Sequence, residues 1–458
     1  MQEIGRNIDK RVPLLVGVLS IGFPNFKYKI AEEYLKKTLE RMEQKGVELL
    51  CGKRTLVTEE EINAEADRLA SAGVDLLVVQ NGTYSHGTCM MHIITTFRDT
   101  PILLWGFTEP LIEGFTGLPL NSLCGLNMFG SFLHKVGKTY SYVYGDVDDA
   151  KVYEKVRLTF VALQVKKQLK QSKFCVIGGR APGFYLSSAD EIRLRHEVGP
   201  EIVHYSLASL LSDMEKLPEE EVREEKRKMD GEVFLVTSTG KMMERTARIY
   251  LAVKGFQKKH NIDGFAIKCW PEFQELANCS VCGVVSRLNN DGTMTSCEGD
   301  VTGLLSMYIQ YLVTNKNCFF ADLVNINPNG TVKAWHCGPA PLSLTRDFAS
   351  TKYTEHPTIR QGMGIALDFK MMLGPVLMLK MKEETKGYTV FMAKGEAVEE
   401  DRVVDANQTD IRFEVGAEAF LDAVMQHGIE HHYAVVYADI REELKELSKW
   451  MDFNVVQP

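Results

Sequence analysis

The sequence predicts an α/β protein with two doubly wound α/β domains followed by a β-rich C-terminal domain. Short, continuous apolar runs alternate with amphipathic helical segments up to about residue 340, a pattern typical of parallel strands buried on both faces. After that residue, short β-like runs separated by glycines replace the alternation. We therefore expect domains over 1–150, 151–340 and 341–458.

The composition excludes several classes of protein. The chain has 458 residues, of which 45% are hydrophobic and 25% charged, so it is globular and long enough for two or three domains. Its formal net charge of −8 is spread along the chain, which argues against a nucleic-acid partner. The sequence contains no uninterrupted run of about 18 apolar residues, the length that a membrane-spanning helix requires. The polar start over 1–11 lacks the apolar core of a secretory signal, so we expect a cytoplasmic protein.

The first domain follows the alternation of strands and helices in order. The apolar run PLLVGVLS predicts a buried strand, and apolar positions then recur at helical spacing as far as Gly46. A hydroxyl N-cap at Thr58, with Glu61 three residues later, predicts a further helix. The expected elements are strands at 13–20, 47–50, 75–80 and 101–105 and helices at 27–45 and 58–73.

Polar groups follow two of these strands, at the sheet edge where doubly wound folds usually bind ligands. The segment QNGT at 80–83 makes Gln80 and Asn81 candidate substrate contacts, and WGFTEP at 105–110 adds further polar and aromatic groups. Ordinary turn chemistry of Asn-Gly and Pro explains the same segments about as well.

The second domain repeats the pattern and contains a glycine-rich turn. The segment FCVIGGRAPGF at 174–184 fits neither phosphate-binding glycine pattern, so we keep a tight turn with Arg180 as a candidate anion contact. The charged segment 216–230 predicts a solvated helix. A strand is expected at 264–270, and it ends at Trp270. The remaining expected elements are helices at 152–171 and 241–259 and a strand at 234–239.

The C-terminal domain is predicted from glycine-punctuated apolar runs. These runs predict strands at 376–381, 388–392 and 411–415, and a closing helix is expected at 440–451.

Acid–base and metal-binding groups are densest between residues 297 and 338. This stretch contains Glu298 in CEGD, Asp322 in FFAD and His336 in WHCG. A helix after Glu298 followed by a strand would bring the two carboxylates together. The turn NPNG at 327–330 predicts a hairpin that returns His336 toward the strand of Asp322.

Two more histidines, His431 and His432, begin an apolar segment near the C-terminus. Strand alternation points them to opposite faces, so we expect only one to face the site. Carboxylates with imidazoles suit a divalent ion such as Mn²⁺, which polarises a carbonyl and a neighbouring hydroxyl while a carboxylate moves a proton between adjacent carbons. Aldose–ketose isomerisation requires this chemistry. The plainer alternative is a set of hydrogen-bonded core residues.

The ten cysteines lie mostly within apolar runs and predict reduced, buried thiols. Only Cys279 and Cys282 have the C-x-x-C spacing of a metal site. The next cysteine, Cys297, begins no second pair, so we do not expect zinc there.

These motifs resemble the L-fucose/L-arabinose isomerase family. CEGD and FFAD are similar to the family segments that carry its metal-binding carboxylates, WHCG to a glycine-flanked metal histidine, and EHHYAVVY at 430–437 to a segment whose second histidine is a ligand. The resemblance implies that Glu298 and Asp322 bind the metal and shuttle the proton through a cis-enediol. It also implies that His336 and His432 are ligands, with His432 preferred to His431.

A weaker similarity covers NMFGSFLHKVG at 127–137. It implies that His134 contacts the substrate of a neighbouring subunit, in a homo-oligomer that is a trimer or a hexamer built from trimers. The N-terminal strand ends do not reproduce the sugar-reading residues of the family.

The open-chain sugar substrate remains undefined among a pentose, a 6-deoxyhexose and a hexose substituted at C6, a sulfonated sugar included. Arg180, Lys135 and Lys138 are candidate partners for an anionic group, and Trp270 is a further candidate substrate contact. Two alternatives stay open: a non-catalytic sugar-binding protein and a metallohydrolase that uses the same ligands.

Overall fold

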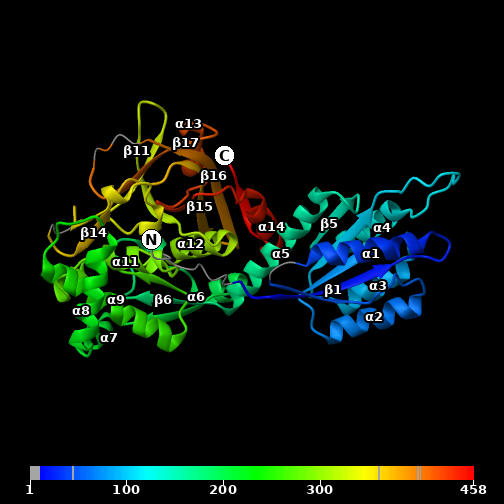
Figure 1. Ribbon diagram of the computed structural model, residues 1–458, viewed down its shortest axis with the longest axis horizontal. Coiled ribbons are helices and arrows are strands. Elements are labelled where there is room, and N and C mark those ends of the chain that lie inside the picture. The colour runs from blue at the N-terminus through cyan, green and yellow to red at the C-terminus, as the bar shows by residue number, and fades with distance from the viewer. Residues whose placement is uncertain (1–10, 44–45, 359–361, 400–401, 403) are drawn as a thin grey trace. The chain divides into compact units, whose positions relative to one another are not determined.

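The computed structural model describes residues 11–43, 46–358, 362–399, 402 and 404–458 (Figure 1). Contacts divide the chain into an N-terminal unit, Arg11–Lys167 with Glu442–Trp450, and a larger unit, Gln168–Arg441 with Met451–Pro458. The predicted α/β class with a strand-rich C-terminal region is confirmed. The three-domain division at 150 and 340 stays a prediction.

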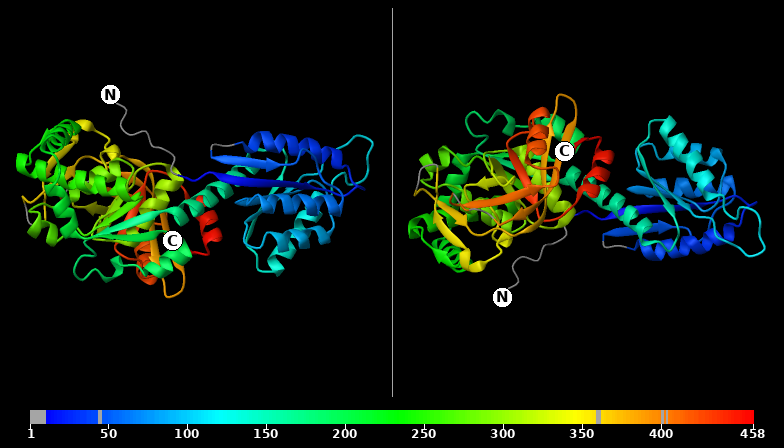
Figure 2. Two further views of the ribbon diagram at one scale, coloured as in Figure 1. Left: turned by 90° about the horizontal axis from the view of Figure 1, so that it is seen from below. Right: turned by 90° about the horizontal axis from the view of Figure 1, so that it is seen from above.

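A five-stranded parallel sheet forms the centre of the N-terminal unit. Its strand order, β2-β1-β3-β4-β5, reverses beside β1, which makes the fold doubly wound as expected. Helices cover both faces of the sheet (Figure 2). The strands are β1 (Leu14–Ile21), β2 (Val47–Cys51), β3 (Leu76–Asn81), β4 (Ile102–Phe107) and β5 (Tyr140–Gly145). The helices are α1 (Tyr28–Met42), α2 (Glu59–Ser71), α3 (Gly87–Thr96), α4 (Ser122–Lys135) and α5 (Ala150–Gln171), whose last residues enter the larger unit.

Local sequence signals account for much of this unit. The Thr58 hydroxyl accepts a hydrogen bond from the Glu61 amide and caps α2, as predicted. Strands β3 and β4 are buried along their whole length, which explains their continuous apolar sequences. The predicted helix at 27–45 ends earlier, at Met42; its residues 44–45, and residues 1–10 of the polar start, lie outside the described residues.

A smaller parallel sheet, of order β10-β9-β6-β7, organises the first part of the larger unit. Its strands are β6 (Lys173–Ile177), β7 (Glu201–Tyr205), β9 (Gly264–Ile267) and β10 (Met294–Ser296). The helices of this part are α6 (Glu191–Arg193), α7 (Leu207–Glu215), α8 (Glu219–Glu232), α9 (Gly240–His260), α10 (Glu272–Leu276), α11 (Cys282–Asn290) and α12 (Val301–Thr314), with short turns η1 (Tyr185–Ser187) and η2 (Leu194–Val198). The carboxyl ends of β6 and β10 lie at the same edge because both strands run parallel to β9.

The other strands of the larger unit form a closed antiparallel ring. The order β15-β18-β11-β12-β17-β16 closes through pairing of β15 with β16, and β19 adds to β16 in parallel. The strands are β11 (Phe319–Ile326), β12 (Val332–His336), β15 (Gly374–Glu383), β16 (Tyr388–Val398), β17 (Asn407–Phe413), β18 (His432–Val436) and β19 (Asn454–Val456). The predicted hairpin of β11 and β12 is confirmed. Both strands also pair with strands from beyond residue 340.

The remaining elements complete the larger unit and contain two departures from expectation. Strands β8 (Leu235–Val236), β13 (Lys352–Glu355) and β14 (Ile365–Asp368) form a small sheet, accompanied by η3 (Leu342–Leu344), η4 (Phe348–Ser350), α13 (Ala417–Gln426) and α14 (Arg441–Met451). The strand expected at 234–239 is only the two residues of β8. The helix expected over 216–230 begins at Glu219, because Pro218 serves as its N-cap. Among the described helices, none is both long enough and apolar enough to cross a membrane.

Candidate active site

Glu298 lies in a strained turn directly after β10. Its backbone is left-handed (φ 58°), as is that of Gly299 (φ 72°), and such conformations in non-glycine residues are concentrated at functional sites. A Cβ on residue 299 would lie 2.2 Å from the carbonyl oxygen of Gly179, so the turn after β10 packs tightly on the glycine-rich turn after β6. The Ala181 amide also donates to the Glu298 carbonyl (3.2 Å). These contacts fix the backbone from which the Glu298 side chain extends.

Three neighbouring strands of the ring bring the other predicted ligands together. Asp322 on β11 lies opposite His432 on β18 and opposite Trp335 on β12. His336 is the last residue of β12. The residues identified by sequence motifs are thus adjacent because of antiparallel register.

The four predicted ligands converge in the larger unit. His432 Nε2 lies 2.7 Å from Glu298 Oε2 and 3.6 Å from Asp322 Oδ1. Ligand atoms of Glu298, His336 and His432 all lie within 4.8 Å of one another, and so do those of Asp322, His431 and His432. Trp270, predicted as a substrate contact, donates from Nε1 to Glu298 Oε1 (3.0 Å).

Two polar atoms of this cluster are buried without a hydrogen-bond partner among the described residues, namely His336 Nε2 and Asp322 Oδ1. Buried polar atoms normally form hydrogen bonds, so a bound group is the natural explanation for two neighbouring buried atoms that form none. Carboxylate oxygens and imidazole nitrogens are ligands that a divalent ion such as Mn²⁺ accepts. The residues present therefore fit the predicted ion.

The expectation that only one of His431 and His432 faces the site is wrong. Their ring centroids lie 4.0 Å apart, and both side chains offer a nitrogen close to Asp322. Strand β18 begins at His432, so His431 precedes the strand and does not follow its alternation.

A buried charge network supports His432 from behind. Asp300 Oδ2 accepts from His432 Nδ1 (2.9 Å), and the same carboxylate caps α12 through the Gly303 amide (2.7 Å). Lys380, which is fully buried, lies 3.2 Å from Asp300 and 2.8 Å from Glu430. A carboxylate on the second nitrogen of a metal-binding histidine fixes the ring orientation. Sequence reasoning missed this network, although Lys380 interrupts an otherwise apolar strand and was a usable signal.

Electrostatics distinguish the groups of the cluster. Burial acts to raise the pKa of Glu298, but the hydrogen bond from His432 and the charge of His336 outweigh it and hold that pKa below its usual value. Burial likewise acts to lower the pKa of His432, but hydrogen bonds to Asp300 and Glu298 raise it. The pKa of His431 is lowered, by burial and by repulsion from His432. At His336 burial is outweighed by Cys337 and the nearby carboxylates, which raise the pKa to about 10.

Aromatic side chains enclose one side of the cluster. The ring of Phe184 lies 5.9 Å from Trp270, 5.3 Å from His431 and 6.3 Å from His432, between ring centroids. Phe320 contacts His432 from β11, at 4.7 Å. Phe184 ends the glycine-rich turn, so this turn contributes to the site through an aromatic wall, a role that the sequence pattern did not indicate.

The other predicted substrate contacts lie in different settings. Arg180 follows the glycines that pack on Gly299, and its guanidinium lies over the ring of Tyr185 (4.6 Å). In the N-terminal unit, Gln80 and Asn81 are fully buried in β3, and Gln80 donates to Thr38 (2.6 Å). His134 is exposed on α4 and lines a cavity of about 440 Å³ within the N-terminal unit. The sugar contacts predicted for these residues stay predictions.

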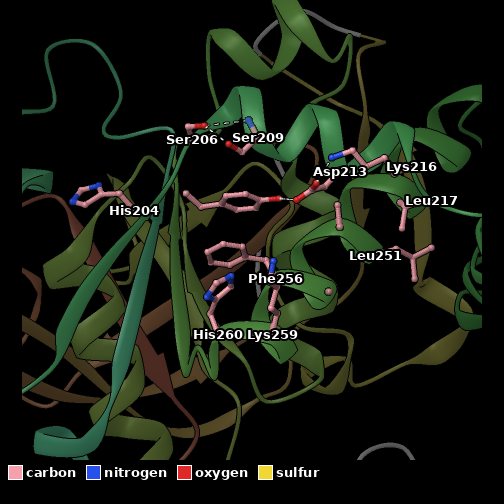
Figure 3. Close-up of a pocket in the computed structure, with 13 residues that line it drawn as sticks. His204, Ser206, Ser209, Asp213, Lys216, Leu217, Leu251, Phe256, Lys259 and His260 are labelled. Carbon is pink, nitrogen blue, oxygen red and sulfur yellow. Dashed lines mark hydrogen bonds and ion pairs between the residues drawn. The ribbon is translucent and has the colours of Figure 1, made fainter.

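A cavity of about 620 Å³ between α7 and α9 lies apart from the predicted residues (Figure 3). Three of its polar side chains bond to one another: Tyr205 donates to Asp213 (2.7 Å), which also accepts from Lys216 (3.1 Å). Phe256 stacks on Tyr205 at 3.9 Å and fills part of the wall. We therefore place the active site at the carboxylate–histidine cluster and not in this cavity.

Comparison with known proteins supports the motif resemblance. Residues 335–457 match the C-terminal domain of L-fucose isomerase. A sulfoquinovose isomerase from Priestia aryabhattai is 27% identical over 436 residues, which cover 95% of this chain and 97% of the relative. A sulfoquinovose isomerase from Alkalicoccus urumqiensis is 27% identical over 91% of this chain and 95% of its own.

Solved structures give a weaker comparison. A periplasmic solute-binding protein from Actinobacillus succinogenes 130z with bound D-allose is 11% identical, with 66% of this chain and 92% of that chain covered. Its TM-score of 0.18 is too low to support a shared fold. These matches agree with the aldose–ketose isomerase activity that the motifs indicate, and they show that the chain is similar to fucose isomerase in its C-terminal part and to sulfoquinovose isomerases over most of its length.

Proposed function

We propose that the protein is a divalent-metal-dependent isomerase in which Glu298, Asp322, His336 and His432 hold Mn²⁺. The observation that carries this proposal is a pair of buried atoms, His336 Nε2 and Asp322 Oδ1, that have no hydrogen-bond partner among the described residues and lie beside Glu298 and His432. When bound, such an ion polarises the sugar carbonyl and the neighbouring hydroxyl.

The two carboxylates supply the proton transfer. One carboxylate takes the proton from C2 of the open-chain aldose while O1 gains a proton, which gives a cis-enediol. A proton returned to C1, with loss of the proton on O2, then gives the ketose. Glu298 Oε1 accepts a hydrogen bond from Trp270, which fixes the orientation of this side chain. The Asp322 side chain is 29% exposed and that of Glu298 13%, so Asp322 is the more accessible of the two carboxylates to a reacting proton.

The aromatic wall protects the intermediate. Phe184, Trp270 and Phe320 cover the cluster with apolar surface, and excluding water from a reactive enediol suppresses side reactions.

For the substrate we propose a hexose with a sulfonate at C6, namely sulfoquinovose. The similarity to sulfoquinovose isomerases over most of the chain supports this choice. Arg180 supports it chemically, because its backbone packs beside Gly299, next to Glu298, and a guanidinium can bind a sulfonate through paired N–H groups. Pentoses and 6-deoxyhexoses offer no group that would need this arginine.

A sugar screen tests metal and substrate together. The full chain is stripped of metal with a chelator, and sulfoquinovose, glucose, fucose and arabinose are followed by NMR before and after Mn²⁺ is added. We expect turnover of sulfoquinovose only with metal, and an increase in KM of about tenfold or more in Arg180→Gln for sulfoquinovose, without a matching change for a neutral sugar. Full activity after chelation would contradict the metal proposal, and turnover of neutral sugars alone would contradict the substrate.

Two further expectations accompany the proposal. We propose a homo-oligomer, a trimer or a hexamer, in a cytoplasmic setting. Light scattering of the purified protein checks the first, and a monomer at working concentration would contradict it.

A further inference from the structure

A second cluster of metal-binding side chains lies directly behind His336. It consists of Cys282 at the start of α11, Cys337 just after β12, and His356 just after β13. All three residues are buried, with exposed fractions of 1%, 8% and 3%. Each offers one ligand atom, and these atoms lie within 4.8 Å of one another.

The distance between the two sulfurs fits a shared ion. Cys282 Sγ lies 3.4 Å from Cys337 Sγ. A disulfide would need about 2.05 Å. Two sulfurs on a tetrahedral zinc, with Zn–S bonds of about 2.3 Å, stand roughly 3.8 Å apart, so a shift of a few tenths of an ångström would complete the geometry.

His356 is oriented to contribute its other nitrogen. Its Nδ1 accepts a long hydrogen bond from the Thr358 amide (3.4 Å), so the neutral ring carries its proton on Nε2. Binding of an ion through Nε2 would require the other tautomer, with the ring proton on Nδ1 and this long bond given up. In that tautomer a neutral imidazole is a good zinc ligand.

Close backbone packing holds the three residues in place. A Cβ on Gly283 would lie 2.4 Å from Ile365, and a Cβ on Gly364 would lie 2.5 Å from the Ser280 amide nitrogen. The start of α11 is therefore pressed against β14, whose neighbour β13 leads to His356. Such rigid support is what a preformed metal site requires.

We propose that Cys282, Cys337 and His356 form a separate site for a thiophilic divalent ion such as Zn²⁺. The donor set of two sulfurs and one nitrogen is soft, unlike the carboxylate-rich set around Glu298, so the two sites select different metals. A solvent molecule would take the fourth position. Sequence spacing pointed to Cys279 with Cys282, whereas the fold pairs Cys282 with Cys337.

The site also has a role in positioning His336. Cys337 Sγ lies 3.3 Å from His336 Nδ1. The Cys337 amide donates to the same nitrogen (2.9 Å), so both contacts of Cys337 meet the His336 ring at Nδ1. An ion bound to Cys337 would therefore also restrict the orientation of the His336 ring, through the residue next to it.

Cobalt titration tests the proposal with a spectroscopic readout that is independent of enzyme activity. The full chain is reduced, stripped of metal and titrated with Co²⁺ in a phosphine reductant. Thiolate ligands give an intense charge-transfer band in the near ultraviolet, which a site of carboxylates and imidazoles does not give. We expect this band to saturate at one equivalent and Zn²⁺ to abolish it.

Matched variants show which side chains give rise to the charge-transfer band. Cys282→Ser should remove it, and His356→Gln should weaken Co²⁺ binding at this site by about tenfold or more. Cys279→Ser is the control, because Cys279 is equally buried but bonds to Thr246 instead (3.7 Å). Glu298→Gln should keep the band, which separates this site from the proposed catalytic one.

The wild-type titration decides the matter even if a variant fails to fold. Absence of a thiolate band from the reduced wild-type chain would overturn the proposal. So would a band that persists in Cys282→Ser or disappears in Cys279→Ser with its circular dichroism unchanged.

Discussion

Replacement of Asp300 by asparagine separates the charge of the buried network from its shape. Asparagine is also a good helix N-cap, so the bond to the Gly303 amide can persist. The negative charge that pairs with Lys380 (3.2 Å) and accepts from His432 Nδ1 (2.9 Å) is lost. The variant therefore reports on the charge alone.

The expected cost follows from the contacts that remain. Breaking a buried ion pair costs about 3–5 kcal/mol. Because Glu430 still lies 2.8 Å from Lys380, we expect the lower end, about 3 kcal/mol in the free energy of unfolding. Loss of the carboxylate on His432 should also weaken Mn²⁺ binding by about 10–100-fold.

The pH dependence carries a defined sign. Burial acts to raise the pKa of Asp300, but Lys380 and His432 outweigh it and hold that pKa well below its usual value. A depressed carboxyl pKa contributes stability above the unfolded value of about 3.9, and this contribution is lost as the pH falls below it. The difference between wild type and Asp300→Asn should therefore shrink below about pH 4.

Guanidinium unfolding and calorimetric Mn²⁺ titration measure both effects. Asp439→Asn is the control, since Asp439 is 37% exposed and pairs with Arg441 and Lys394. It should cost less than about 1 kcal/mol and leave Mn²⁺ affinity unchanged. The reasoning is refuted if Asp300→Asn and the control behave alike.

Three further predictions concern the same cluster. Gly299→Ala should destabilise the fold by about 1–3 kcal/mol and slow turnover, because its methyl group would lie 2.2 Å from the Gly179 carbonyl oxygen. A variant with the same melting temperature and turnover rate as the wild type would contradict this prediction. Mn²⁺ affinity should rise with pH toward about pH 10, by up to about tenfold per pH unit for each displaced proton. The reason is that the pKa of His336 is raised to about 10, so the metal must displace its proton. Calorimetry in a pH series that shows constant affinity would refute this prediction. Asp322→Asn should lower kcat by at least about 100-fold. It should affect stability less than Asp300→Asn does, because the Asp322 side chain is 29% exposed. A near-normal kcat in a stopped NMR assay would count against a catalytic role of Asp322.

The sequence predicted those parts of the site that depend on local pattern. The hairpin turn at 327–330 placed His336 near Asp322, and periodicity placed α12 between Glu298 and Asp322. The family motifs added His432, which antiparallel pairing brings opposite Asp322. Each of these relations depends on a short stretch of chain or on a motif.

Contacts between distant segments were not predictable in the same way. Pairing of β15 with β16 closes the ring, and its register places Lys380 beside Asp300, 80 residues away in sequence. The pairing of Cys282 with Cys337 depends on how α11 packs against β14, whereas C-x-x-C spacing suggested Cys279. Side-chain packing across the fold, which periodicity does not encode, decides such contacts.

Solvent deuterium incorporation in Glu298→Gln tests the central claim most directly. With Mn²⁺ and sulfoquinovose in D₂O, the wild-type chain should form the ketose and introduce deuterium at C1 or C2 without hydrolysing any bond. Glu298→Gln, folded by circular dichroism, should introduce none. Undiminished exchange in the variant would contradict the assignment, as would sugar binding without exchange, or bond hydrolysis, in the wild type.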